Sequence, residues 1–183
     1  MKAKDVALVA LFVSISVVLR FSPLKYPTPW GMKIDLVAVP ILVAYFLFGF
    51  RTAFLCLTLV GLTIVVSSPD SWIGASAKFL ATLPMFLFLE ILVVLRGNRE
   101  ILRDPRYATL GLMIGVLFRG ILMIPLNYYV FLPIWLTKTT EEIMKFLPWW
   151  GIFIPNVIQG AIDVVLSYLL VFKTKAFRLV VED

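Results

Sequence analysis

The chain contains no histidine and only one cysteine among its 183 residues. Without histidine it lacks a common transition-metal ligand and the usual proton shuttle near neutral pH. A single cysteine cannot form a disulfide within the chain. Cys56 lies inside an apolar run, where a thiol is expected to pack as a small buried hydrophobic group. The sequence therefore gives little support to metal-centred or thiol-based chemistry.

Catalytic motifs and charged residues are also scarce. The sequence shows no Gly-rich phosphate loop, no cluster of metal ligands and no nucleophile motif. Charged residues make up 15% of the chain, apolar residues make up 61%, and the mean hydropathy is +0.99. These values are typical of a polytopic membrane protein. Its helices leave no room for a nucleotide-binding domain, so an energy source is expected in another chain or an ion gradient.

Six apolar segments fill most of the sequence, and a membrane-spanning helix needs about 20 residues. We predict an all-α, polytopic membrane protein with six transmembrane helices in one domain, residues 1–183. The N-terminal segment lacks a small-x-small cleavage site and is predicted to remain as the first helix. Loop 22–33 contains prolines that favour extended or turn backbone, and segment 132–150 is amphipathic and interfacial. The six predicted helices cover about residues 6–21, 34–50, 52–66, 75–95, 108–131 and 151–172.

The distribution of positive charge predicts the orientation in the membrane. Ten lysines and arginines lie in the termini and the loops on their side, against four in the opposite loops. Because cytoplasmic loops carry the excess of positive charge, both termini are predicted to be cytoplasmic. Membrane topology thereby explains the net charge of +6. We expect membrane lipid as a partner and no nucleic acid. We expect a multi-pass protein of the cell membrane.

Side-chain amides occur in the last two apolar segments. Asn127 lies in one of them, and Asn156, Gln159 and Asp163 follow in the other at i, i+3 and i+7. This spacing places the last three on one face of a helix. Amides are costly in hydrocarbon unless they have a partner, so this face is expected to meet a cavity, a ligand or another helix.

Counting helical rise places several polar residues at one level near the outer membrane surface. Loops carrying Trp30 and Trp72 are expected to close over this level. A half-buried pocket with apolar walls and a few convergent polar groups would fit a small molecule. The alternative is that the amides bond across helices and only stabilise packing. The polar residues at this level are Asn127, Asn156, Gln159, Lys78 and Asp35.

Arg119 and Asp163 lie near mid-membrane, where an isolated charge is expensive. We predict an ion pair between them that joins the last two helices, in preference to a proton or ion relay.

Small residues recur along the first helix at Ala3, Ala7 and Ala10. Such spacing permits close approach of another helix. By itself it does not distinguish packing within the chain from a subunit interface.

Three stretches carry a resemblance to a known family: GMKIDLVAVPILVAYFLFGF, GLMIGVLFRGILMIPLNYYVFLPIW and IPNVIQG. They resemble the substrate-binding S components of energy-coupling factor vitamin transporters, and within that group the riboflavin-specific member. The similarity runs from about residue 4 to residue 172, and residues 127–133 are its most specific part.

The resemblance implies six helices that bind a vitamin from outside under the loop between helices 1 and 2. It also implies a transmembrane coupling subunit, which the small residues of helix 1 would contact, and two cytoplasmic ATPases. In riboflavin-specific members an Asn in helix 5 and an Asn-x-x-Lys pair in helix 6 bond the flavin ring. Asn127 and Asn156 match these positions, whereas Gln159 stands in place of the lysine. Glutamine keeps the hydrogen-bonding capacity and loses the charge.

The chemistry of the amides agrees with a flavin. The pyrimidine edge of the ring alternates carbonyl acceptors with an N–H donor, and carboxamides supply both functions without a buried charge. Tyr128, Trp30 and Trp72 are candidates to cover the flat ring. Riboflavin is then a transported ligand, and no cofactor, catalytic residue or metal is expected. The alternatives are an S component for a different vitamin and a small intramembrane enzyme that uses Asp, Glu and Lys residues.

Overall fold

The structure is a computed structural model that describes residues 3–29, 32–67 and 71–174. Helices make up most of this part, and one short antiparallel hairpin interrupts them. The predicted all-helical fold is thus confirmed apart from that hairpin. In chain order the elements are α1 Ala3–Phe21, β1 Tyr26–Pro27, β2 Lys33–Ile34, α2 Val39–Phe48, α3 Phe50–Ser67, α4 Ser71–Arg96, η1 Arg99–Arg103, α5 Pro105–Leu126, η2 Asn127–Phe131, α6 Leu132–Leu136, α7 Thr140–Phe146, α8 Trp149–Tyr168 and η3 Leu169–Lys173.

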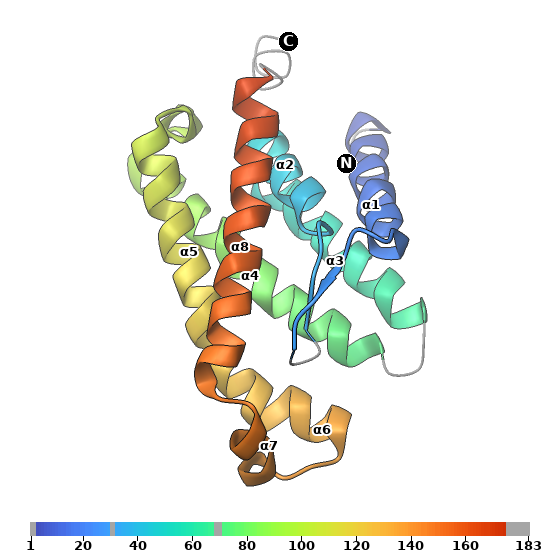
Figure 1. Cartoon of the computed structure of the whole chain (residues 1–183). Helices are drawn as coiled ribbons and strands as arrows, with labels where there is room; N and C mark the ends of the chain where they lie inside the picture. Colours follow the sequence, from blue (N-terminus) through green and yellow to red (C-terminus); the bar gives the residue numbers. More distant parts are fainter. Residues whose placement is uncertain (1–2, 30–31, 68–70, 175–183) are drawn as a thin grey trace.

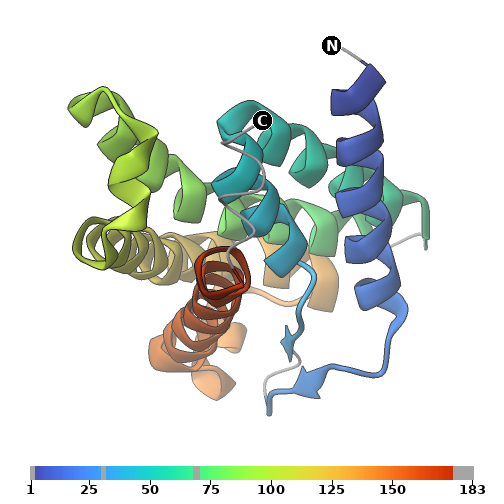
Figure 2. The same ribbon diagram turned by 90° about the horizontal axis from the view of Figure 1, so that it is seen from above.

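Helix α4 connects the two halves of the bundle, because it packs against α3 on one side and α5 on the other. Helix α8 packs on α5 and also reaches α2. The start of α1 and the end of η3 lie toward one end of the molecule, and α6 and α7 lie at the other (Figure 1). Seen from above, the hairpin crosses the space between α1 and α8 (Figure 2).

The second helix is shorter than predicted. The sequence suggested residues 34–50, whereas α2 covers Val39–Phe48. Pro40 occupies its first turn, where a missing N–H costs nothing. At the other end Gly49 adopts φ +91°, and its N–H donates to the carbonyl of Tyr45 at 2.9 Å. Glycine tolerates this left-handed conformation, so the chain turns there directly into α3.

Residues 33 and 34 belong to the hairpin rather than to a helix. Tyr26 pairs with Ile34, and Pro27 pairs with Lys33. The hydroxyl and the N–H of Thr28 donate to the carbonyl of Met32 at 2.9 and 2.7 Å. The prolines of this loop therefore produce extended backbone, as the sequence predicted.

The predicted fifth helix continues through a wider turn into two short helices. Helix α5 ends at Leu126, and η2 forms a π-helical turn directly after it. Such turns are frequent at functional sites in helices. Helix α7 begins with a capping box in which Thr139 and Glu142 bond to each other's backbone N–H. The amphipathic segment 132–150 thus forms α6, α7 and the start of α8.

Two glycines allow helices to approach closely beside the functional region. A Cβ at Gly115 would lie 2.9 Å from Cα of Met85 on α4. A Cβ at Gly120 would lie 2.8 Å from the ring of Phe153 on α8. These contacts hold α4, α5 and α8 together at short distance.

In the described part of the chain, four helical stretches are long and apolar enough to cross a membrane. Helix α2 is apolar but shorter, and α1 carries three charged residues, Lys4, Asp5 and Arg20, near its ends. Helix length and composition therefore support four of the six predicted spans. The four stretches are Phe50–Ser67, Trp72–Arg96, Pro105–Leu136 and Trp149–Lys173.

Candidate functional site

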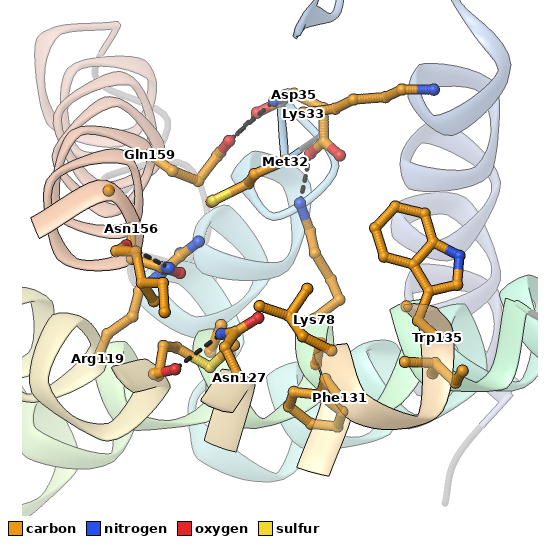
Figure 3. Close-up of a pocket in the computed structure, with 18 of the residues that line it drawn as sticks. Met32, Lys33, Asp35, Lys78, Arg119, Asn127, Phe131, Trp135, Asn156 and Gln159 are labelled. Atoms are coloured by element: carbon orange, nitrogen blue, oxygen red, sulfur yellow. Dashed lines mark hydrogen bonds and ion pairs between the residues drawn. The ribbon is translucent and has the colours of Figure 1, made fainter. Parts of the chain in front are cut away.

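A cavity of about 420 Å³ lies among the hairpin, α4, α5, η2, α6 and α8 (Figure 3). This volume falls within the range of roughly 300–1,000 Å³ that is usual for small-molecule sites. Five polar residues predicted from the sequence line it together, although they come from three helical elements and the segment between β2 and α2. These residues are Asp35, Lys78, Asn127, Asn156 and Gln159.

The two asparagines have similar local environments. Each lies just after an internal helix proline, Pro125 or Pro155, which cannot donate a backbone hydrogen bond. Asn127 donates from its side-chain amide to the carbonyl of residue 123 at 2.7 Å, and Asn156 donates to the carbonyl of Ile152 at 2.9 Å. These bonds orient the amides. Asn127 keeps its carbonyl oxygen and a further N–H that a ligand could use, and Asn156 keeps a further N–H beside a carbonyl oxygen that accepts a long bond from Nε of Arg119 at 3.5 Å.

Gln159 has a different role from the asparagines. Its Oε1 accepts from the backbone N–H of Asp35 at 2.8 Å, and its Nε2 donates to the carbonyl of the same residue at 2.6 Å. Nε2 also donates to Oδ1 of Asp163 at 2.9 Å. Both ends of the amide are therefore engaged by protein groups. Gln159 ties the segment after the hairpin to α8.

Asp35 forms a close ion pair with Lys78 of α4. Its carboxylate also accepts from the backbone N–H of Val37 at 3.0 Å. Burial by itself raises the pKa of this carboxyl, but the Lys78 ammonium and the two hydrogen bonds outweigh burial, so its pKa lies below the ordinary value. Asp35 therefore stays ionised at neutral pH, and its negative charge offsets the positive charge of Lys78 within the cavity.

The predicted ion pair between Arg119 and Asp163 is confirmed. Their closest side-chain atoms lie 3.4 Å apart, and the two side chains are 2% and 0% exposed. Ser167 anchors the same part of α8, because its hydroxyl donates to the carbonyl of Val39 at 3.1 Å. The sequence did not indicate that Arg119 also lines the cavity.

The predicted aromatic cover differs from the one observed. Tyr128 is not among the lining residues; it is buried, and its hydroxyl donates to the carbonyl of Leu147 at 2.7 Å. Tyr128 thus supports the wall from behind. Trp72 does not line the cavity either, and Trp30 lies outside the described residues. The rings that line it are Phe131 and Trp135.

A sequence signal for these rings exists. Phe131 and Trp135 follow Asn127 at i+4 and i+8, which places them on one helical face. Trp135 lies on the opposite side of the cavity from Arg119 and Asn156 (Figure 3). A flat ligand between these walls would meet polar groups on one side and an aromatic ring on the other.

The small residues of α1 face outward. Ala7 and Ala10 are exposed, whereas Val9 and Phe12 of the same helix are buried. The side chain of Ala3 lies outside the described part of the chain. Packing within the chain therefore buries the opposite face of α1.

Comparison with protein families gives a match over residues 4–172 to the model "ECF transporter, substrate-specific component". The chain belongs to this family. Its members are transporter components, so the enzyme alternative finds no support.

Curated relatives include the riboflavin transporter RibU of Lactococcus lactis subsp. cremoris, strains NZ9000 and MG1363. Each is 23% identical over 140 residues, which cover 73% of this chain and 65% of the relative. The chain thus aligns with slightly less than two thirds of these relatives' length.

A solved structure described as the S component of a bacterial ECF transporter matches the whole fold. The TM-score is 0.76 at 25% sequence identity, and the match covers 98% of this chain and 99% of that one. The cavity described above therefore lies within the fold of an S component.

Proposed function

We propose that this chain captures riboflavin from outside the cell as the substrate-binding subunit of an ATP-driven vitamin uptake transporter. The observation that carries the proposal is the convergence of Asn127 and Asn156 on one cavity, with Phe131 and Trp135 in its lining. The amides match the alternating acceptors and donor of the flavin edge, and the aromatic rings suit its flat face. The similarity to a riboflavin transporter supports the same substrate.

The charges of the cavity favour a neutral ring over other vitamins. Lys78 is paired with Asp35 and Arg119 is paired with Asp163, so these two ion pairs of the cavity carry no net charge with which to bind a carboxylate vitamin. The same pairing removes Asp35 as an acidic site for the cationic ring of thiamine. Arg20 and Lys33 also line the cavity, but Arg20 is partly exposed to solvent and Lys33 is exposed. Charges exposed in this way contribute little affinity.

The subunit would cross the membrane six times with both termini in the cytoplasm. The excess of lysine and arginine in the termini and the loops on their side supports this orientation. Helices α1 and α2 would provide the two spans beyond the four long apolar stretches.

The partners would be a transmembrane coupling subunit and two cytoplasmic ATPases. Family membership supports an energy-coupling assembly. The exposed face of α1 at Ala7 and Ala10 is suited to close helix contact with the coupling subunit. The sequence itself offers no phosphate-binding loop, so ATP would be hydrolysed by the partners.

Substitution of each asparagine by leucine tests the site. Asn127→Leu and Asn156→Leu remove amides that face the ligand, and each is expected to weaken riboflavin binding by about tenfold or more. Quenching of riboflavin fluorescence by the purified protein measures the affinity. Ile158→Leu is the matched control, because Ile158 is 45% exposed on the outer face of α8 and should leave the affinity unchanged. Equal and negligible effects of all three changes would contradict the proposal and favour a packing role for the amides.

A further inference from the structure

The buried ion pair presents only its positive member to the cavity. Arg119 is among the lining residues, whereas Asp163 is not. Both side chains are almost fully inaccessible, so water does not screen the guanidinium. A ligand in the cavity would therefore meet the cation of this pair before its counter-ion.

The hydrogen bonds of Arg119 are long compared with those of its neighbours. Its Nη1 lies 3.4 Å from Oδ2 of Asp163 and 3.6 Å from the sulfur of Met85, and its Nε lies 3.5 Å from Oδ1 of Asn156. Typical N–H···O bonds are about 2.9–3.0 Å. By contrast, the bonds of Gln159 measure 2.6–2.9 Å. Among the described residues, the guanidinium thus has no contact to an oxygen atom at ordinary hydrogen-bond length.

The other cations that line the cavity are differently placed. Lys78 is engaged in its close pair with Asp35. Lys33 is exposed and Arg20 is partly exposed. Arg119 is therefore the buried cation with donor capacity to spare, and it lies beside Asn156 on the same wall (Figure 3).

We propose that Arg119 is a specificity-determining residue that donates hydrogen bonds to a ring carbonyl oxygen of the bound ligand. This inference rests on the proposed function and deepens it, because the ring carbonyl that Arg119 would contact belongs to the same flavin edge that Asn156 would bind. Arg119 would supply the positive charge against that edge, while Gln159 is engaged in holding the Asp35 backbone.

The chemistry of the flavin edge provides a specific readout. The ring N–H between the two carbonyls is a weak acid that loses its proton in alkaline solution, and its ionisation changes the absorption spectrum. A cation beside the neighbouring carbonyl stabilises the anionic ring and lowers the pKa of that N–H. A purely structural ion pair, distant from the ligand, would leave this pKa unchanged.

The test compares variants that separate charge from packing. The double variant Arg119→Met with Asp163→Asn removes both charges and leaves no buried ion unpaired. Asp163→Asn alone keeps the cation, and Arg119→Lys keeps the charge but loses the planar fork. Folding of each variant is checked by thermal unfolding in detergent, and riboflavin binding is measured by fluorescence titration.

We expect Asp163→Asn to bind riboflavin at least as tightly as the unchanged protein, because the cation remains and its competing acceptor is lost. The double variant should bind about tenfold or more weakly, and Arg119→Lys should lie between them. Absorbance titration of the bound ligand should show the ring N–H ionising at lower pH in the unchanged protein, Asp163→Asn and Arg119→Lys than in the double variant.

Equal losses in Asp163→Asn and the double variant, or identical pH profiles in all of them, would overturn the role of Arg119. Unchanged affinity in the double variant would overturn it as well, with the proposed function intact. Failure of the unchanged protein to bind riboflavin would instead reject the proposed function and this inference together.

Discussion

Two carboxylate–cation pairs lie at the same cavity and differ in kind. Asp35 and Lys78 form a close pair at the hairpin side, where Lys78 remains 16% exposed. Arg119 and Asp163 form a longer pair that is 2% and 0% exposed, between α5 and α8. The first pair joins a loop to a helix, and the second joins two helices.

The difference shows how one site combines rigidity with spare binding capacity. Asp35 is held by Lys78, by Val37 and through its backbone by Gln159, so its position is fixed by short bonds from several elements. Arg119 is buried, and its hydrogen bonds to protein acceptors are longer than those of Asp35. An acceptor on a ligand could offer the guanidinium a shorter hydrogen bond. In a low-dielectric setting a better-placed acceptor gains more than it would in water.

The largest effect is expected where a buried charge is left without its partner. Arg119→Met leaves the buried carboxyl of Asp163 without its counter-ion, and should lower the free energy of unfolding by about 3–5 kcal/mol. Adding Asp163→Asn should restore most of this loss, because the unpaired charge is removed. Chemical unfolding in detergent, followed by circular dichroism, measures both variants. A double variant no more stable than the single one would show that burial of charge does not dominate this site.

The next effect concerns the bonds that hold the hairpin side. Gln159→Leu leaves the N–H and carbonyl of Asp35 without their partners, which should cost about 1–3 kcal/mol. Hydrogen exchange should increase in the segment that includes Asp35, while α3 keeps its protection. Ile158→Leu serves as the neighbouring control, with no change in exchange. Unaltered exchange at Asp35 in Gln159→Leu would contradict the role given to this amide.

Lys78→Met should change how the stability of the protein depends on pH. In the unchanged protein the pKa of Asp35 is lowered, so its stabilising contribution is complete above the ordinary carboxyl pKa and is lost only as pH falls through the lowered value. Stability attributable to this pair should therefore be constant between pH 7 and pH 5.

Without Lys78, burial dominates and raises the pKa of Asp35 above its ordinary value. The variant should then become more stable as pH falls from 7 to 5, because protonation removes the buried charge. Unfolding curves at the two pH values test this, with Lys78→Arg as the control that keeps the pair. A variant whose stability is independent of pH would contradict it.

The smallest effect is expected for the solvent-exposed cation Lys33. Lys33→Gln should change riboflavin binding by less than about 1 kcal/mol, and the change should shrink as salt is added. Fluorescence titration at low and high ionic strength measures it. A large effect that is insensitive to salt would mean that Lys33 closes over the ligand.

Much of the polar site could be predicted from the sequence, because an amide in an apolar segment is conspicuous. Asn127, Asn156 and Gln159 were placed at one level by helical rise alone, and the pairing of Arg119 with Asp163 followed from the cost of isolated charge. The different roles of these groups could not be predicted. Whether Gln159 meets a ligand or the Asp35 backbone depends on where the hairpin runs, and no periodicity encodes that path.

Local backbone features explain the remaining differences. The pairing of the hairpin strands, with Pro40 in the first turn of α2, shortened the predicted second helix. The π-helical turn after Leu126 could not be predicted from a sequence pattern with a period of 3.6 residues. Tyr128 falls within this turn, where its side chain points to Leu147 and leaves Phe131 and Trp135 at the cavity. The aromatic residues of the sequence predicted that a ring would line the cavity, and the local backbone determined which aromatic side chains do so.

Direct titration tests whether the amide-lined cavity binds riboflavin. Purified protein, freed of any copurifying small molecule, is titrated into riboflavin while fluorescence is recorded. We expect saturable quenching at one site per chain, with the ligand recovered unchanged, and a clear loss of affinity in Asn156→Leu. Absence of quenching, together with saturable binding of a different vitamin, would show that riboflavin is not the substrate.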